Sequence, residues 1–135
     1  DGINEVMMVG DKRKYNVALV TLKAVGANGE VPGTDNLDAG AARINPDVKT
    51  ISAAMDDKTW IDAVNAAIKA ANEDGRCCAN NASKIQKFTI VPTNFSEEGG
   101  ELTPTKKLKR KFVETKYASM IDKMYGSKET YVKWS

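Results

Sequence analysis

Residues 99–110 read Gly-Gly-Glu-Leu-Thr-Pro-Thr-Lys-Lys-Leu-Lys-Arg, and they form the most informative stretch of this 135-residue chain. Gly99 and Gly100 allow the backbone positive φ angles without a Cβ penalty. Pro104 fixes its own φ and biases the residue before it toward extended geometry. A hinge followed by a stiffened cationic strip predicts an extended segment that presents one ammonium group, that of Lys107. Composition alone favours another interpretation, a solvated basic surface turn.

Outward from this stretch, short β-branched and aliphatic runs predict three strands. They cover residues 6–9, 17–22 and 88–91. The polar segment 10–14 joins the first two runs and predicts a hairpin. The stretch 26–40 is rich in Gly, Asn, Asp and Pro, and it predicts a long excursion on the surface.

Apolar side chains recur at helical spacing in two further places. The first stripe predicts a helix over residues 57–73, with Asp56 or Asp57 as its N-cap. The second predicts one continuous helix over residues 111–125. Shorter helical pieces are predicted at residues 39–44 and 79–84. Together these elements predict a small α+β domain, in which a roughly three-stranded sheet is covered by two main helices.

Length and composition limit the classes of protein that fit. A chain of 135 residues makes one domain, and 28% charged and 41% hydrophobic residues are ordinary for a globular protein. The net charge of +2 does not call for nucleic acid or an anionic membrane as a partner. Histidine is absent, which excludes the usual general base and the commonest zinc ligand.

Three further features concern the compartment, membrane insertion and the origin of the chain. Cys77 and Cys78 are adjacent, which is poor geometry for a disulfide and unlike a zinc spacing, so we expect a reducing compartment. No apolar run approaches the length of about twenty residues that a membrane span needs. The sequence lacks an initiator methionine and begins almost directly with a strand pattern, so we expect it to be a piece of a larger protein.

Several motifs agree with one known family. The pattern Gly-Glu-Leu-Thr-Pro-Thr-x-Lys-Leu-Lys-Arg, from Gly100 onward, resembles the signature near the end of long-chain fatty acyl-CoA synthetases in the superfamily of adenylate-forming ligases. Residues 9–23 are similar to the hairpin that opens their C-terminal lobe, and residues 84–96 to the strand and loop before the lysine motif. Residues 112–125 are similar to the final helix. The resemblance is closest to the bubblegum-type branch and is loose over residues 25–56.

This resemblance implies that residues 1–135 are the single C-terminal lobe of a larger ligase, whose large N-terminal domain binds ATP and the acyl group. Such a ligase activates a long-chain fatty acid with ATP through an acyl-adenylate and transfers the acyl group to coenzyme A. ATP and Mg²⁺ are then bound mainly by the N-terminal domain, which is the lobe's partner, and the isolated lobe is inert. The implied location is the cytoplasm or the cytosolic face of a membrane, with a membrane surface as a further partner of the parent protein.

The resemblance also implies roles for particular residues. The family's adenylation lysine corresponds to Lys107 by register, and Thr105 and Lys106 are candidates for nucleotide contact. Lys106 stands where the family commonly has an apolar residue, so a second ammonium group could compete with Lys107 or assist it. In an extended strand, Leu108 would face the core and Lys107 the opposite side. The other cations of the region are interpreted as a solvated rim: Lys109, Arg110, Lys111 and Lys116.

Three alternatives stay open on the sequence alone. A stand-alone nucleic-acid-binding module would use residues 106–116, although aromatic residues do not alternate with the cations and the net charge is small. A second alternative is the interaction lobe of an adenylating-type protein without activity. A third keeps the chemistry but changes the carboxylic acid, for example to an aryl or medium-chain acid.

Overall fold

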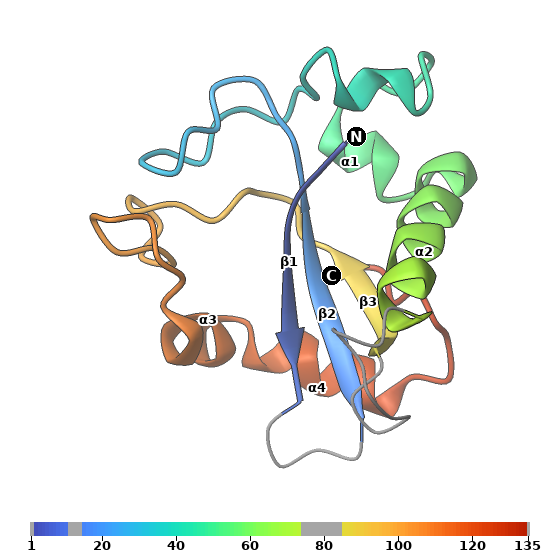
Figure 1. The fold of residues 1–135 in the computed structure, drawn as a ribbon, viewed down its shortest axis with the longest axis vertical. Coiled ribbons are helices and arrows are strands. Elements are labelled where there is room, and N and C mark those ends of the chain that lie inside the picture. The colour runs from blue at the N-terminus through green and yellow to red at the C-terminus, as the bar shows by residue number, and fades with distance from the viewer. Residues whose placement is uncertain (1, 11–14, 74–84, 135) are drawn as a thin grey trace.

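The computed structural model describes residues 2–10, 15–73 and 85–134. A three-stranded sheet lies at its centre, in the order β1-β2-β3 (Figure 1). Its strands are β1 (Ile3–Val9), β2 (Asn16–Leu22) and β3 (Ile85–Ile90). The predicted hairpin pairing is confirmed, because β1 and β2 are antiparallel, whereas β2 and β3 are parallel. All three predicted strands are present, and each begins one to three residues earlier than the sequence pattern indicates.

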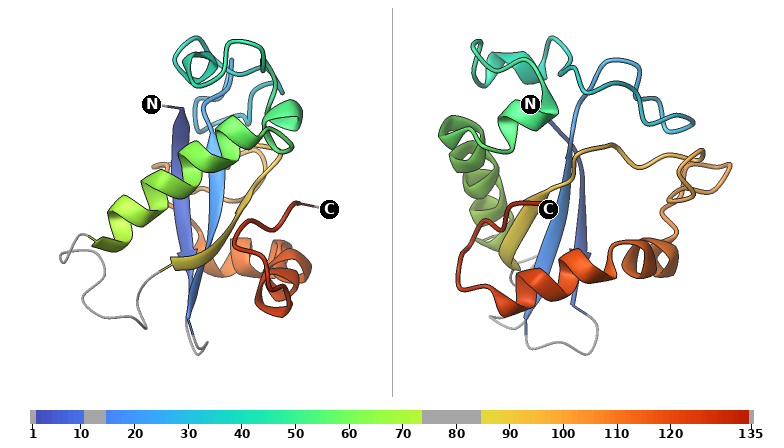
Figure 2. Two further views of the ribbon diagram at one scale, coloured as in Figure 1. Left: turned by 90° about the vertical axis from the view of Figure 1, so that its right-hand side faces the viewer. Right: turned by 180° about the vertical axis from the view of Figure 1, so that it is seen from behind.

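Helices cover both faces of this sheet. The short α1 (Ile51–Ala54) and the long α2 (Lys58–Glu73) lie on one face, and α3 (Arg110–Lys116) and α4 (Ala118–Gly126) lie on the other (Figure 2). A 3-10 turn, η1 (Ala41–Arg43), occurs where the sequence predicts a short helical piece. The predicted α+β class, with a three-stranded sheet and helices packed on it, is confirmed.

The central strand β2 explains how one sheet supports two cores. Ala18, Val20 and Leu22 are fully buried against the α1 and α2 side. Val17 and Leu19 are fully buried against the α3 and α4 side. A strand that is covered on both faces needs a nearly continuous apolar run rather than an alternating one, and the sequence of β2 supplies it.

The helix on the first face begins as predicted. The Asp57 carboxylate accepts a hydrogen bond from the Trp60 backbone N–H at 3.0 Å, which satisfies one of the free donors of the first turn. Trp60, Val64 and Ile68 follow at helical spacing and are buried in the first core. The predicted piece at 79–84, the connection over 11–14, Cys77 and Cys78 lie outside the described residues.

The second predicted helix is not continuous, which corrects the expectation for residues 111–125. Tyr117 leaves helical geometry, with φ −109° and ψ 23°, and separates α3 from α4. The Tyr117 hydroxyl donates to Glu101 at 2.8 Å, and its ring meets the Trp134 ring edge to face at 5.0 Å. We attribute the break to these two tertiary contacts, since the residue's own sequence position fits the apolar stripe.

Two segments outside the sheet complete the arrangement. The excursion after β2 and the segment around residues 97–107 project toward the same side of the molecule (Figure 1). The C-terminal segment returns beside β3, where Phe88 and Tyr131 form a parallel bridge. Within the described ranges, no helix is both long and apolar enough to cross a membrane.

Candidate functional site

The segment that carries Lys107 is a tight turn, which corrects the prediction of an extended strip. Leu102 and Leu108 form an isolated antiparallel bridge, and we call residues 102–108 the lysine hairpin. The Thr103 N–H donates to the Lys107 carbonyl at 2.8 Å, and the Lys106 N–H donates to the Thr103 carbonyl at 2.8 Å. Pro104 therefore occupies the second position of a β-turn, where its fixed φ is favourable.

The threonine hydroxyl groups of the turn form hydrogen bonds inside the turn itself. The Thr103 hydroxyl accepts a hydrogen bond from the Lys107 N–H at 3.1 Å. The Thr105 hydroxyl lies 3.0 Å from the Thr103 hydroxyl, and Thr105 is exposed. The structure therefore places Thr105 beside Lys107 on the hairpin, and its predicted nucleotide contact stays a prediction.

Lys106 closes the turn and points toward an acidic side chain. Its φ of 66° is in the left-handed region, which side chains other than glycine seldom adopt. Its ammonium group lies 3.2 Å from a Glu97 carboxylate oxygen. Both side chains are partly exposed, so the ion pair stabilises the fold by at most about 1 kcal/mol. The pair nevertheless directs the Lys106 ammonium group toward Glu97.

Lys107 itself is exposed, whereas the next residue, Leu108, is half-buried and packs against the second core. The predicted division between an inward Leu108 and an outward Lys107 is confirmed, although a turn produces it and not a strand. Among the residues that the structure describes, no acidic side chain pairs with the Lys107 ammonium group. As far as the described residues go, this cation is available to an anion from outside the lobe.

The base of the hairpin contains a buried carboxylate that the sequence interpretation missed. Glu101 is only 2% exposed. One oxygen accepts from the Ser96 N–H at 3.1 Å, and the other accepts from the Lys116 ammonium group at 2.7 Å and the Tyr117 hydroxyl at 2.8 Å. A carboxylate with three donors is satisfied in this environment. Residue type alone could not reveal it, because a Glu beside two glycines is usually exposed.

The pKa values in this cluster follow from burial and hydrogen bonding. Burial acts to raise the pKa of Glu101, but the hydrogen bonds from Lys116, Ser96 and Tyr117 together outweigh it and lower that pKa. Burial, followed by the hydrogen bond to Glu101 and its charge, raises the pKa of Tyr117. Glu101 is therefore ionised and Tyr117 is neutral at physiological pH.

Two of the cations interpreted as a solvated rim have specific partners. Lys116 pairs with the buried Glu101 and also donates to the Gly99 carbonyl at 3.1 Å. The Arg110 guanidinium donates to the Met8 carbonyl on β1. Lys109 lies over the exposed Phe112 ring, with its ammonium group 5.2 Å from the ring centroid. Arg110 and Lys116 are both exposed, as the rim interpretation expects, and each also has a specific partner within the lobe.

The two glycines before Glu101 have different roles. Gly100 adopts a φ of 89°, as the sequence predicts. Gly99 does not have a positive φ, which corrects that part of the expectation. A Cβ atom on Gly99 would instead lie 2.3 Å from a Glu101 carboxylate oxygen. Glycine is required there to leave room for the buried carboxylate.

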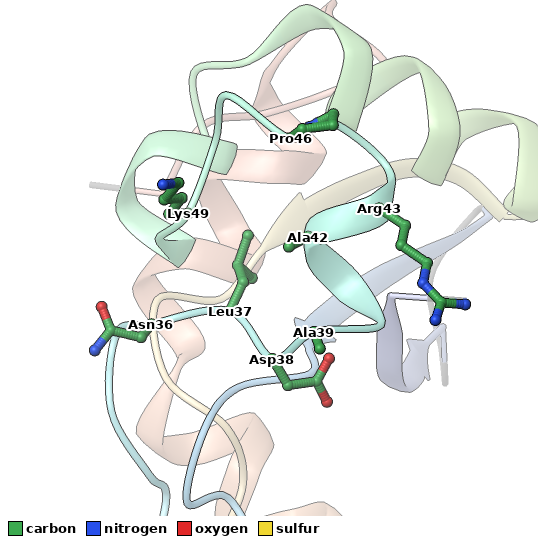
Figure 3. Close-up of a pocket in the computed structure, with 8 residues that line it drawn as sticks. All are labelled: Asn36, Leu37, Asp38, Ala39, Ala42, Arg43, Pro46 and Lys49. Atoms are coloured by element: carbon green, nitrogen blue, oxygen red, sulfur yellow. The ribbon is translucent and has the colours of Figure 1, made fainter.

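Other surfaces of the lobe are less suited to charged substrates. A depression of about 520 Å³ lies beside η1, but its two cations, Arg43 and Lys49, point in different directions (Figure 3). In the described part of the chain, no group of three or more His, Cys, Asp or Glu residues could hold a metal ion.

Comparison with known proteins identifies the class. Residues 33–129 match the family model described as AMP-binding enzyme C-terminal domain. The chain therefore belongs to this family of C-terminal domains. No solved structure gives a significant match to the chain.

Individual relatives define the branch. The chain is 40% identical over 135 residues to the long-chain-fatty-acid–CoA ligase ACSBG2 of Gallus gallus. The matched region covers 95% of this chain and 17% of that protein. It is 33% identical over 127 residues to the long-chain-fatty-acid–CoA ligase FadD15 of Mycobacterium tuberculosis. That match covers 92% of this chain and 18% of FadD15. Human ACSBG2 is 35% identical over 129 residues. The resemblance to long-chain ligases of the bubblegum type is confirmed, and the chain spans less than a fifth of the length of these relatives.

Proposed function

We propose that this chain is the C-terminal lobe of an ATP-dependent long-chain fatty acid–CoA ligase and that Lys107 is its adenylation lysine. The observation that carries the proposal is the different environment of two neighbouring cations. Lys106 is directed toward Glu97, whereas Lys107 projects from the hairpin without an acidic partner among the described residues. The match to C-terminal domains of AMP-binding enzymes and the printed names of the relatives support the substrate class.

The chemistry explains why a cation is needed. In the first half-reaction, a fatty acid carboxylate attacks the α-phosphate of ATP, pyrophosphate leaves, and an acyl-adenylate forms. In the second, the thiol of coenzyme A displaces AMP and forms the acyl thioester. The first step brings two anions together in a site short of water. One ammonium group at 4 Å offsets this repulsion by about 4 kcal/mol at an effective dielectric constant near 20.

The remaining requirements fall to the rest of the ligase. We assign ATP and Mg²⁺ mainly to the N-terminal domain, and we route no step through the metal on this lobe. The ATP and acyl sites belong to the N-terminal domain, which is this lobe's partner. A lysine on a separate small lobe can be presented in one half-reaction and withdrawn in the next, as in other enzymes gated by a moving element. We place the parent ligase in the cytoplasm or at the cytosolic face of a membrane.

The test is Lys107→Ala in the full-length ligase. We expect adenylation to fall by a factor of about 10² to 10³, the usual effect of losing one preorganised charge donor. Fatty acid-dependent exchange of pyrophosphate into ATP measures this step. Thioester formation from supplied acyl-adenylate should change little, because the lysine is needed only while carboxylate and phosphate approach.

Lys111→Ala is the matched control for that variant. Lys111 is an exposed cation on α3, so its loss changes the local charge equally without altering the hairpin. It should leave both half-reactions close to wild type. Equal losses in the two half-reactions of Lys107→Ala, or no loss in either, would show that Lys107 lacks the assigned role.

A further inference from the structure

The lysine hairpin has little support of its own. The Leu102–Leu108 bridge and the two hydrogen bonds between Thr103 and Lys107 join its two arms. An isolated two-stranded hairpin is at best marginally stable in water. Contacts at the base of the hairpin therefore help to hold the backbone that carries Lys107 in place.

Glu101 supplies the main-chain part of this support. The Glu101 and Leu102 N–H groups both donate to the Ser96 carbonyl, at 3.1 and 3.2 Å. The Lys109 N–H donates to the Glu101 carbonyl at 2.7 Å. These bonds join the residues just before and just after the hairpin, so a shift of Glu101 moves both of its arms.

The Glu101 side chain connects this base to the helical layer. Its buried carboxylate receives Lys116 from the last turn of α3 and Tyr117 from the junction of α3 and α4. The Ser96 N–H joins the same carboxylate from the loop after β3. One side chain thus links the base of the hairpin to the loop after β3 and to the end of α3, and the charge of the carboxylate strengthens all three hydrogen bonds.

The surroundings leave this carboxylate little freedom. Lys116 also donates to the Gly99 carbonyl, so the same ammonium group binds both the carboxylate and the backbone before the hairpin. Gly99 leaves room for the carboxylate, and a Cβ atom on Gly100 would lie 2.7 Å from the Phe112 ring. The cluster therefore has one well-defined packing.

We propose that Glu101 is a positioning residue for adenylation, acting through Lys107, with Lys116 and Tyr117 as its supports. The inference rests on the proposed function of Lys107. Catalysis by a fixed charge depends on distance, and a misplacement of about 1 Å from a change outside the reacting centre can cost about a hundredfold in rate. Glu101 never needs to touch the substrate to have this effect.

Glu101→Gln in the full-length ligase tests the proposal, because it keeps the shape of the side chain and removes its charge. We expect kcat for adenylation to fall about ten- to a hundredfold, with a much smaller change in KM for ATP. Thioester formation from supplied acyl-adenylate should stay close to wild type. In a Lys107→Ala background, Glu101→Gln should cause little further loss, since the group that it positions is already absent.

Two additional variants keep the test decisive if Glu101→Gln does not fold. Tyr117→Phe removes one donor to the carboxylate and keeps the ring that packs on Trp134. It should give a smaller loss, again confined to adenylation. Val64→Ala, in the buried face of α2 on the opposite side of the sheet, is the control for general destabilisation. Below its melting temperature it should affect neither half-reaction selectively.

The outcomes separate the two proposals. Normal adenylation by Lys107→Ala would overturn the proposed function itself. If Lys107→Ala is impaired, the role of Glu101 is overturned by wild-type adenylation in Glu101→Gln or Tyr117→Phe. It is also overturned by equal losses in both half-reactions, or by a full additional loss in the double variant.

Discussion

Among single residues, Glu101 and Glu5 have pKa values shifted in opposite net directions, although burial acts to raise both. Burial acts to raise the pKa of Glu101, yet hydrogen bonds from Lys116, Ser96 and Tyr117 lower it overall. Burial raises the pKa of Glu5 on β1, and the charge of Glu101 raises it further. The ionised form of Glu101 therefore stabilises the fold, whereas the ionised form of Glu5 is unfavourable.

This contrast predicts a pH dependence of stability for the purified chain. The folded pKa of Glu101 lies below its unfolded value near 4.5. Its contribution to the free energy of unfolding is thus fully present above about pH 4.5 and is lost as the pH falls through the folded pKa. Glu101→Gln should lower the melting temperature at neutral pH, and the difference from wild type should narrow on acidification. Thermal unfolding followed by circular dichroism across this range measures it.

Glu5→Gln is the control with the opposite sign. The folded pKa of Glu5 lies above 4.5, so its favourable contribution is present at low pH and is lost as the pH rises through the folded pKa. Glu5→Gln should accordingly raise the melting temperature at neutral pH, with the gain disappearing below about pH 4.5. A pH-independent difference in both variants would contradict the assigned pKa directions.

Among the elements, the sequence predicts best those that depend on local periodicity. The apolar run of β2 and the stripe of α2 are clear in the sequence, since each element buries side chains at its own period. The break at Tyr117 is not visible in the sequence, because Tyr117 continues the apolar stripe and its distinguishing contacts, among them those with Glu101 and Trp134, come from the fold. Contacts between residues far apart in the sequence override local preference at this point.

The lysine hairpin shows the same limit at the candidate site. Pro104 is equally compatible with an extended strand and with the second position of a β-turn, so the sequence does not choose between them. The position of Lys107 was predictable from the motif, but the buried partner Glu101 was not. Its donors come from residues 96, 116 and 117, which only the fold brings together.

The left-handed residue of the hairpin gives a prediction at the element scale. Lys106→Gly should relieve a backbone strain of about 1 kcal/mol or more, because glycine adopts positive φ readily. The exposed pair with Glu97 that it loses is worth at most about 1 kcal/mol. We expect the hairpin to fold and adenylation to fall much less than in Lys107→Ala, because the Lys106 ammonium group is paired with the Glu97 carboxylate. Pyrophosphate exchange by the full-length variant measures this.

Lys106→Ala separates the effect of the backbone strain from the effect of the lost ion pair with Glu97. It removes the ion pair but keeps a Cβ atom at positive φ, so it should be less stable than Lys106→Gly. A loss of adenylation in Lys106→Gly as large as that in Lys107→Ala would mean that the two ammonium groups share the catalytic role.

At the scale of the whole molecule, the surface beside Lys106 is acidic rather than basic. Backbone hydrogen bonds from Glu97 to Gly29 and from Glu98 to Glu30 tie the excursion after β2 to the segment before the hairpin. An open depression of about 310 Å³ beside these bonds is lined by Val31, Glu30, Glu97 and Glu98. Acidic walls repel a triphosphate, so this depression is poorly suited to the phosphates of ATP.

The isolated chain should be inert. We expect the purified 135-residue chain to catalyse no fatty acid-dependent exchange of pyrophosphate into ATP, because its exposed lysine has no bound carboxylate and phosphate to neutralise. The full-length ligase, assayed at the same molar concentration, is the positive control, and its Lys107→Ala variant sets the level expected when the lysine is missing. Exchange by the pure chain above the background without enzyme would contradict this division of labour, because the small lobe would then have to contain both the nucleotide pocket and the catalytic cation.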